Sequence, residues 1–219
     1  MLLFQLLGVV VLLVFGGLNL GAGGVDALGD AVAIAILQGF FYVGMVLGPL
    51  VAARKGRGLV AEFALRFRWW DVPLGFVAGP VVQLGVVLLY LPFSGLLDRE
   101  ELGEPARQLA RTADDTVGVI ALAVVVVLCA PLVEELFFRG LLLGALRKRG
   151  LSDWPAVLVS SAVFGVAHFQ PLQLPALFAF GVVSAWLVLR TGRLGPSIFM
   201  HMSFNGITML ALYLSGDLG

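Results

Sequence analysis

Long apolar runs, broken by short charged or Gly/Pro-rich stretches, are the feature that most limits how this chain can fold. A helix needs about 20 apolar residues to cross the hydrocarbon of a bilayer, and inside lipid its backbone polar groups must find partners within the protein. The pattern therefore predicts an all-α, polytopic membrane helix bundle of about seven transmembrane helices, or six to eight because the fifth and sixth runs are short. The runs fall at about residues 2–20, 31–53, 72–96, 116–146, 155–169, 173–190 and 195–214.

Composition agrees with a chain that is solvated mainly by lipid. Hydrophobic residues make up 60% of the 219 residues and charged residues only 13%, which lies outside the range of soluble domains. The formal net charge is zero and no long basic run is present, so a nucleic-acid partner is not expected. We expect a single membrane domain over residues 1–219, multi-pass in the cell membrane, with the lipid bilayer as its surroundings. Nothing in the sequence indicates an oligomeric state.

The distribution of charge predicts the orientation of the chain. The first run resembles a signal peptide but lacks a basic start, since the first basic residue is Arg54. We therefore expect a retained helix and a natural start further upstream. Ten basic residues fall in the segments 54–68, 147–149 and 190–193, which the positive-inside rule assigns to the cytoplasm. The acidic segment 98–115 is expected to be a solvated outer loop without chemistry.

Pairs of glycines four residues apart suggest where helices approach one another closely. Small residues at this spacing let two membrane helices bring their backbones together. The pattern occurs at Gly17 and Gly21 and again at Gly140 and Gly144. Close helix packing is expected at both places.

Three charged residues remain inside a predicted span once the loops have taken the others. Glu134, Glu135 and Arg139 lie within the run 116–146, where each ionised group costs about 2.5 to 3.5 kcal/mol near the bilayer centre. Glu135 and Arg139 are four residues apart, the spacing of a helical ion pair. That pair is either purely structural or part of a site. Glu134, about 100° away around the helix, is left as a free carboxylate suited to general-base chemistry.

Both histidines of the chain also lie in or at the end of predicted spans. His168 closes the segment that begins at Phe164, and His201 opens a segment that ends at Asn205. His201 and Asn205 share one helix face because they are four residues apart. At about 1.5 Å of rise per residue, these side chains and Glu134 lie roughly 12 to 24 Å from the nearest charged span ends. The four polar groups are therefore expected to meet in an intramembrane cavity.

The polar residues named above, together with Phe164, form three short motifs on successive predicted helices. In this order they resemble the motifs of the CAAX-protease and bacteriocin-processing (CPBP) family, also called the abortive-infection family. Its eukaryotic relatives include the Ras-converting CAAX endopeptidase. The resemblance covers a catalytic core at about residues 117–210, and the three motifs together are far more specific than any one alone. The motif residues are Glu134, Glu135 and Arg139, then Phe164 and His168, then His201 and Asn205.

The resemblance implies an intramembrane endopeptidase of the CPBP metalloendopeptidase type, dependent on a glutamate. Its substrate would be a membrane-associated or lipid-modified protein or peptide, as in CAAX-type or bacteriocin processing. Glu134 would activate the attacking water and His168 would help to position it. His201 and Asn205 would donate hydrogen bonds to the developing oxyanion. Structural or substrate support would come from Glu135, Arg139 and Phe164.

Metal dependence is a separate question. The family is usually described as metalloproteases, and Glu134, His168 and His201 form a plausible zinc ligand set with one open position. The helical His-Glu-x-x-His signature is absent, however. We expect catalysis that requires no cofactor, with zinc as the alternative.

Two other functions compete with proteolysis. The first is a non-catalytic membrane scaffold, or an immunity or regulatory protein that binds a partner. The second is a proton-coupled transporter that uses Glu134 and the histidines as a relay. The complete set of polar motif residues favours catalysis, because a scaffold has little reason to bury them.

Overall fold

A computed structural model describes residues 29–95, 99–111, 113 and 115–218. These residues form helices and connecting turns without any strand, so the predicted all-α fold is confirmed. The first predicted span, residues 2–20, lies outside the described residues. The principal helices are α2 (Gly29–Lys55), α3 (Leu59–Phe63), α4 (Asp71–Tyr90), α5 (Arg99–Ala110), α6 (Thr116–Ala123), α7 (Ala130–Glu135), α8 (Leu143–Lys148), α9 (Asp153–Val166), α10 (Leu174–Thr191) and α11 (Gly195–Ser215).

Four described helices are long and apolar enough to cross a membrane, at residues 71–93, 116–148, 171–191 and 195–215. Helix α2 occupies the second predicted run, and α9 is a shorter apolar helix of 14 residues. Large apolar side chains on the outside of α4, such as Val77 and Val81, are more than 60% exposed. An exposed apolar surface marks a contact with a membrane or another protein, and on a helix that is long and apolar enough to cross a bilayer it indicates lipid. The chain is a multi-pass membrane protein.

The long helix 116–148 is continuous but not uniform. Two π-helical segments, η3 (Val124–Cys129) and η4 (Leu136–Leu142), flank α7 on either side. A π turn holds one more residue than an α turn and therefore rotates the side chains that follow it, and such turns are frequent at functional sites. The segment η3 thus sets the direction of the side chains on α7, and η4 that of the side chains on α8.

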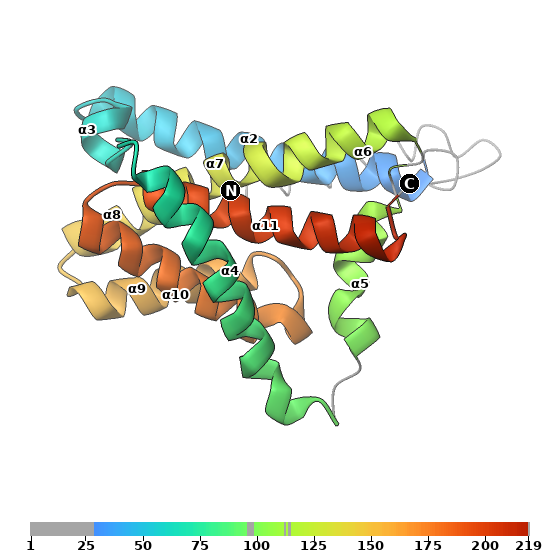
Figure 1. Cartoon of the computed structure of the whole chain (residues 1–219). Helices are drawn as coiled ribbons and strands as arrows, with labels where there is room; N and C mark the ends of the chain where they lie inside the picture. The colour runs from blue at the N-terminus through green and yellow to red at the C-terminus, as the bar shows by residue number, and fades with distance from the viewer. Residues whose placement is uncertain (1–28, 96–98, 112, 114, 219) are drawn as a thin grey trace.

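The basic loops gather at one end of the bundle, where α3 and α8 lie together in Figure 1. Lys148 donates a hydrogen bond to Glu62, and Arg193 Nη2 lies 2.6 Å from Asp71 Oδ1. The first pair joins the end of α8 to α3, and the second joins the turn between α10 and α11 to the start of α4. The loops that the sequence assigned to the same side of the membrane are therefore neighbours.

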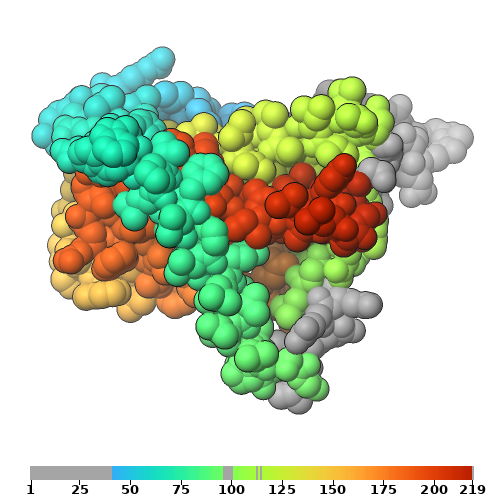
Figure 2. All heavy atoms as spheres, in the orientation of Figure 1, coloured from blue at the N-terminus to red at the C-terminus, as the bar shows by residue number. Residues whose placement is uncertain are grey.

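The closest helix contact is between α4 and α11. Figure 2 shows α4 lying across one face of α11. A Cβ atom on Gly75 would lie 2.3 Å from Phe199 Cβ, and one on Gly79 would lie 2.6 Å from Ser203 Cβ. Only glycine fits at these positions, so the two backbones can touch.

The expected glycine contacts are less close. A Cβ on Gly140 would lie 3.0 Å from Phe63 Cβ, whereas one on Gly144 would meet no atom within 4 Å. The expectation of close packing was therefore wrong for Gly144, because no atom of the described residues comes within 4 Å of that position. Gly17 and Gly21 lie outside the described residues.

Replacing Gly75 with Ala should destabilise the bundle, since the added methyl group overlaps backbone atoms of α11. Overpacking of this kind lowers the free energy of unfolding by about 1 to 3 kcal/mol. Unfolding in mild detergent measures the change. Gly85→Ala is the matched control on the same helix, because its Cβ would meet nothing within 4 Å. Equal stability of the Gly75→Ala and Gly85→Ala proteins would show that the α4–α11 contact is looser than described.

Candidate active site

Glu134 is the centre of a polar cluster that it forms with His168 and His201. Its side chain is buried on α7, and its Oε1 accepts a hydrogen bond from the Tyr42 hydroxyl on α2 at 3.2 Å. Its Oε2 lies 3.9 Å from His168 Nε2 and 3.9 Å from His201 Nε2. Both imidazole rings thus face the same carboxylate oxygen from different helices, at distances too long for direct hydrogen bonds.

The partner of His168 determines which ring nitrogen carries hydrogen. Its Nδ1 lies 2.8 Å from the backbone oxygen of Phe164, one turn earlier on α9. A carbonyl oxygen can only accept, so Nδ1 must donate. In the neutral ring, Nε2 therefore presents a lone pair toward Glu134 and can accept a hydrogen bond.

His201 on α11 bridges the two adjacent glutamates. Its Nδ1 lies 3.0 Å from Glu135 Oε1, and its Nε2 faces Glu134. With Glu135 ionised, Nδ1 must be the donor, so Nε2 can donate only when the ring is protonated. The His201 ring therefore lies between the two carboxylates.

Glu135 is fully buried and is surrounded by donors. The ion pair expected from the four-residue spacing is present, with Arg139 Nε 3.4 Å from Oε2. The hydroxyl groups of Ser184 on α10 and Ser197 on α11 donate to the same oxygen. Both serines interrupt apolar runs, and this was the signal from which sequence reasoning could have found them. Glu135 therefore connects three helices around the cluster.

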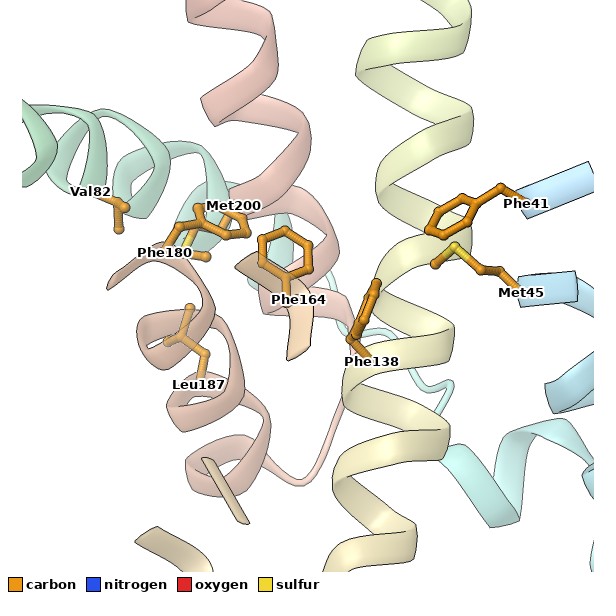
Figure 3. Packing of buried hydrophobic residues seen from close by; sticks show 8 residues of the cluster. All are labelled: Phe41, Met45, Val82, Phe138, Phe164, Phe180, Leu187 and Met200. Carbon is orange, nitrogen blue, oxygen red and sulfur yellow. The ribbon is translucent and has the colours of Figure 1, made fainter. Parts of the chain in front are cut away.

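Arg139 and Phe164 form the wall behind the cluster. The guanidinium of Arg139 lies 4.3 Å from the centre of the Phe164 ring and donates to the Gly181 backbone oxygen. Figure 3 shows Phe164 between Phe138 and Phe180, with ring centroids 5.1 and 5.7 Å away. This aromatic packing fixes Phe164, whose backbone oxygen orients His168.

Asn205 lies one turn after His201 on α11. Its Nδ2 donates to the Val126 backbone oxygen at 2.9 Å, within the π-helical segment η3. An amide nitrogen carries two hydrogens, so the second one is available for another acceptor. The contact with η3 holds the amide in place beside the cluster.

All four predicted catalytic side chains open into one cavity of about 750 Å³, and Tyr42 also lines it. The lining includes Glu134 from α7, His168 from the end of α9, and His201 and Asn205 from α11. A cavity of this size accommodates a peptide segment or a small lipid chain. The expected intramembrane cavity is thus present among the described residues.

Helix α5 corrects the expectation of a featureless acidic loop. Its residues Leu102, Ala106 and Leu109 line the cavity, while Glu104 pairs with Arg111 on the outside. Gln173 Nε2 also donates to the Leu102 backbone oxygen at 2.7 Å. The segment is an amphipathic helix whose apolar face covers the end of the cavity.

The distances between Glu134, His168 and His201 test whether these side chains could bind a zinc ion. Glu134, His168 and His201 offer suitable donor atoms, and each histidine has its Nδ1 held by a second partner, as metal ligands usually do. The Nε2 atoms lie 3.9 Å from Glu134 Oε2, wider than the roughly 3.3 Å between ligand atoms of a tetrahedral zinc ion with bonds of about 2.0 Å. In the part of the chain that the structure describes, no group of three such side chains is gathered closely enough for a metal ion. In this arrangement the three side chains do not fit a tetrahedral zinc ion.

Comparison with known protein families finds a match over the part of the chain that contains the polar cluster. The sequence model of the type II CAAX prenyl endopeptidase Rce1-like family matches residues 116–207. An uncharacterised 24.3 kDa protein of Escherichia coli is 30% identical over 158 residues, which cover 67% of this chain and 72% of that protein. No solved structure matches the chain.

Two relatives carry names that describe an activity. The membrane-embedded CAAX protease MroQ of Staphylococcus aureus is 32% identical over 40% of this chain and 37% of its own length. CAAX prenyl protease 2 of Arabidopsis thaliana is 27% identical over 40% of this chain and 34% of its own length. The chain thus spans well under half the length of these two proteins.

Proposed function

Because the chain belongs to the CPBP family of Rce1-like CAAX endopeptidases, we propose that it is an intramembrane endopeptidase acting on a membrane-associated or lipid-modified protein or peptide. One observation carries this proposal. Glu134 on α7, His168 in the turn after α9, and His201 and Asn205 on α11 open into one cavity between membrane-spanning helices. A carboxylate, two imidazoles and an amide around one cavity can supply a general base for water and hydrogen-bond donors for an oxyanion.

The proposed reaction begins with a water molecule between Glu134 and His168. The 3.9 Å between Glu134 Oε2 and His168 Nε2 suits groups that share a bridging water. Glu134 takes one proton from this water, and the oxygen attacks the carbonyl carbon of the scissile bond. The carbonyl oxygen becomes an oxyanion. The C–N bond then breaks as Glu134 passes its proton to the leaving amine.

The oxyanion needs donors that point into the cavity. In the proposal, the protonated ring of His201 donates from Nε2, while Glu135 holds Nδ1. The free amide hydrogen of Asn205 is the second donor. Each such donor contributes about 2.7 to 4 kcal/mol to transition-state stabilisation in known sites.

The test of this function is cleavage of a lipid-modified peptide by the purified protein in nanodiscs, with the same peptide lacking the lipid as a comparison. Mass spectrometry identifies the products. Cleavage of either peptide at a defined bond supports an endopeptidase, and the ratio between the two rates tells whether the lipid is recognised. Binding without cleavage over a panel of membrane peptides would instead favour the non-catalytic scaffold.

Tyr42 is a positioning residue that sequence reasoning missed, since it lies 92 residues before Glu134. Tyr42→Phe removes only the hydroxyl that donates to Glu134 Oε1. A hydrogen bond to a charged group contributes about 1.5 to 3 kcal/mol, so kcat should fall about tenfold and its pH profile should move. The exposed Tyr213 provides the control Tyr213→Phe. An unchanged kcat and pH profile in Tyr42→Phe would remove Tyr42 from the site.

His201→Gln distinguishes the metal-free mechanism from the zinc alternative. Glutamine can still donate a hydrogen bond, so partial activity is expected if His201 is an oxyanion donor. Elemental analysis of the purified wild-type protein should give less than one zinc per chain. One tightly bound zinc per chain, lost together with activity in His201→Gln, would show that the zinc alternative is right.

A further inference from the structure

A second cavity lies at the basic end of the bundle, away from the polar cluster. It is an open pocket of about 480 Å³ between the segment that precedes α4 and the turn that joins α10 to α11. Three arginines line it: Arg66, Arg68 and Arg193. None of the motif residues takes part in this pocket.

The three arginines carry more positive charge than the neighbouring carboxylate of Asp71 compensates. Arg193 is neutralised by the buried carboxylate of Asp71, to which its Nη2 lies at 2.6 Å. Arg66 and Arg68 are exposed, and neither forms an ion pair among the described residues, although Asp71 also attracts Arg68 and accepts a hydrogen bond from its backbone N–H at 2.8 Å. Arg68 instead packs over the Trp70 ring at 5.1 Å. The pocket therefore has a net positive charge with guanidinium groups free to bind an anion.

Its surroundings place the pocket at the surface of the hydrocarbon. Helix α4 begins at Asp71, α10 ends at Thr191 and α11 begins at Gly195, so three membrane-crossing helices begin or end beside the pocket. Trp69 is 78% exposed, and Trp70 is also exposed. Exposed tryptophans next to arginines mark the level of lipid headgroups.

We propose that this pocket binds the phosphate group of an anionic phospholipid. Guanidinium groups match the geometry of phosphate oxygens, and basic pockets between membrane helices bind anionic headgroups. A lipid seated in the membrane reaches the pocket without leaving the bilayer, whereas free phosphate must come from the water. The bound headgroup holds the segment before α4 against the start of α11, where the Leu194 N–H already donates to the Ala64 oxygen at 2.9 Å.

The test uses the full chain in nanodiscs of phosphatidylcholine alone or with added phosphatidylglycerol. Native mass spectrometry counts retained lipid, and thermal unfolding measures stabilisation. We expect phosphatidylglycerol to be retained and to raise the melting temperature of the wild-type protein. The double variant Arg66→Gln/Arg68→Gln should bind it about tenfold to thirtyfold more weakly, since each arginine near an anionic surface contributes about 1 kcal/mol.

Control variants distinguish lipid binding in the pocket from a general attraction of anionic lipid to surface arginines. Arg149→Gln changes an exposed arginine outside the pocket and should retain the full effect of phosphatidylglycerol. The double variant should melt like wild type in phosphatidylcholine, which shows that it is folded. Equal loss of binding in Arg149→Gln and in the double variant would overturn the site. Equal stabilisation by inorganic phosphate in phosphatidylcholine nanodiscs would show that the ligand is free phosphate and not a lipid headgroup.

Discussion

Glu134→Gln is expected to abolish peptide-bond hydrolysis while leaving the helix bundle folded. The amide has the same shape as the carboxylate, and its oxygen can still accept the hydrogen bond from Tyr42. It cannot take a proton from water at neutral pH. General-base catalysis contributes about 100-fold to 10,000-fold, so kcat/KM should fall at least about 100-fold.

The comparison needs both a rate and a stability measurement. The melting temperature of Glu134→Gln in nanodiscs should stay close to that of wild type, because no buried partner loses its hydrogen bond. Asp153→Asn is the control, since Asp153 forms an exposed pair with Arg147 far from the cluster. Wild-type cleavage by the Glu134→Gln protein would remove Glu134 from the role of base.

Glu135→Ala is expected to destabilise the bundle more than Gly75→Ala does. In the fully buried centre of the bundle, Glu135 forms an ion pair with Arg139. It also accepts hydrogen bonds from Ser184, Ser197 and His201. Its removal leaves the Arg139 guanidinium buried without its carboxylate. A buried charge that loses its partner costs about 3 to 5 kcal/mol.

Unfolding of the purified protein in mild detergent measures this loss. Activity should fall as well, because the ring of His201 is no longer held at Nδ1. Asp153→Ala breaks an exposed ion pair instead, and such pairs contribute at most about 1 kcal/mol. If Glu135→Ala and Asp153→Ala were equally stable, the buried network would contribute little to folding.

Hydropathy predicted the positions of the described helices well, since crossing lipid demands long apolar runs. Helical spacing also predicted the Glu135–Arg139 pair, because partners four residues apart meet within one helix. The hydrogen bond from the Tyr42 hydroxyl to Glu134 could not be predicted in this way. It depends on how α2 packs against the long helix, and no periodicity within either helix contains that information.

Two misinterpretations have physical reasons. Segment 98–115 was expected to be a solvated loop because its charges were counted without regard to period, yet Leu102, Ala106 and Leu109 follow a helical spacing. Glycines four residues apart occur at several places in the chain, and only the backbone of a partner helix decides which pair is in close contact. At Gly75 that partner is α11, whereas Gly144 has none within 4 Å.

Hydrolysis in water enriched in oxygen-18 tests the central claim, that Glu134 directs a water molecule at a peptide bond within the membrane cavity. The wild-type protein in nanodiscs is mixed with a membrane peptide for a single turnover, and the new carboxyl group is analysed by mass spectrometry. The account predicts one oxygen-18 atom in the carboxyl product of the wild-type protein and no product from Glu134→Gln. An intact peptide with folded wild-type protein across a broad panel of membrane peptides, or equal oxygen-18 incorporation by Glu134→Gln, would contradict it.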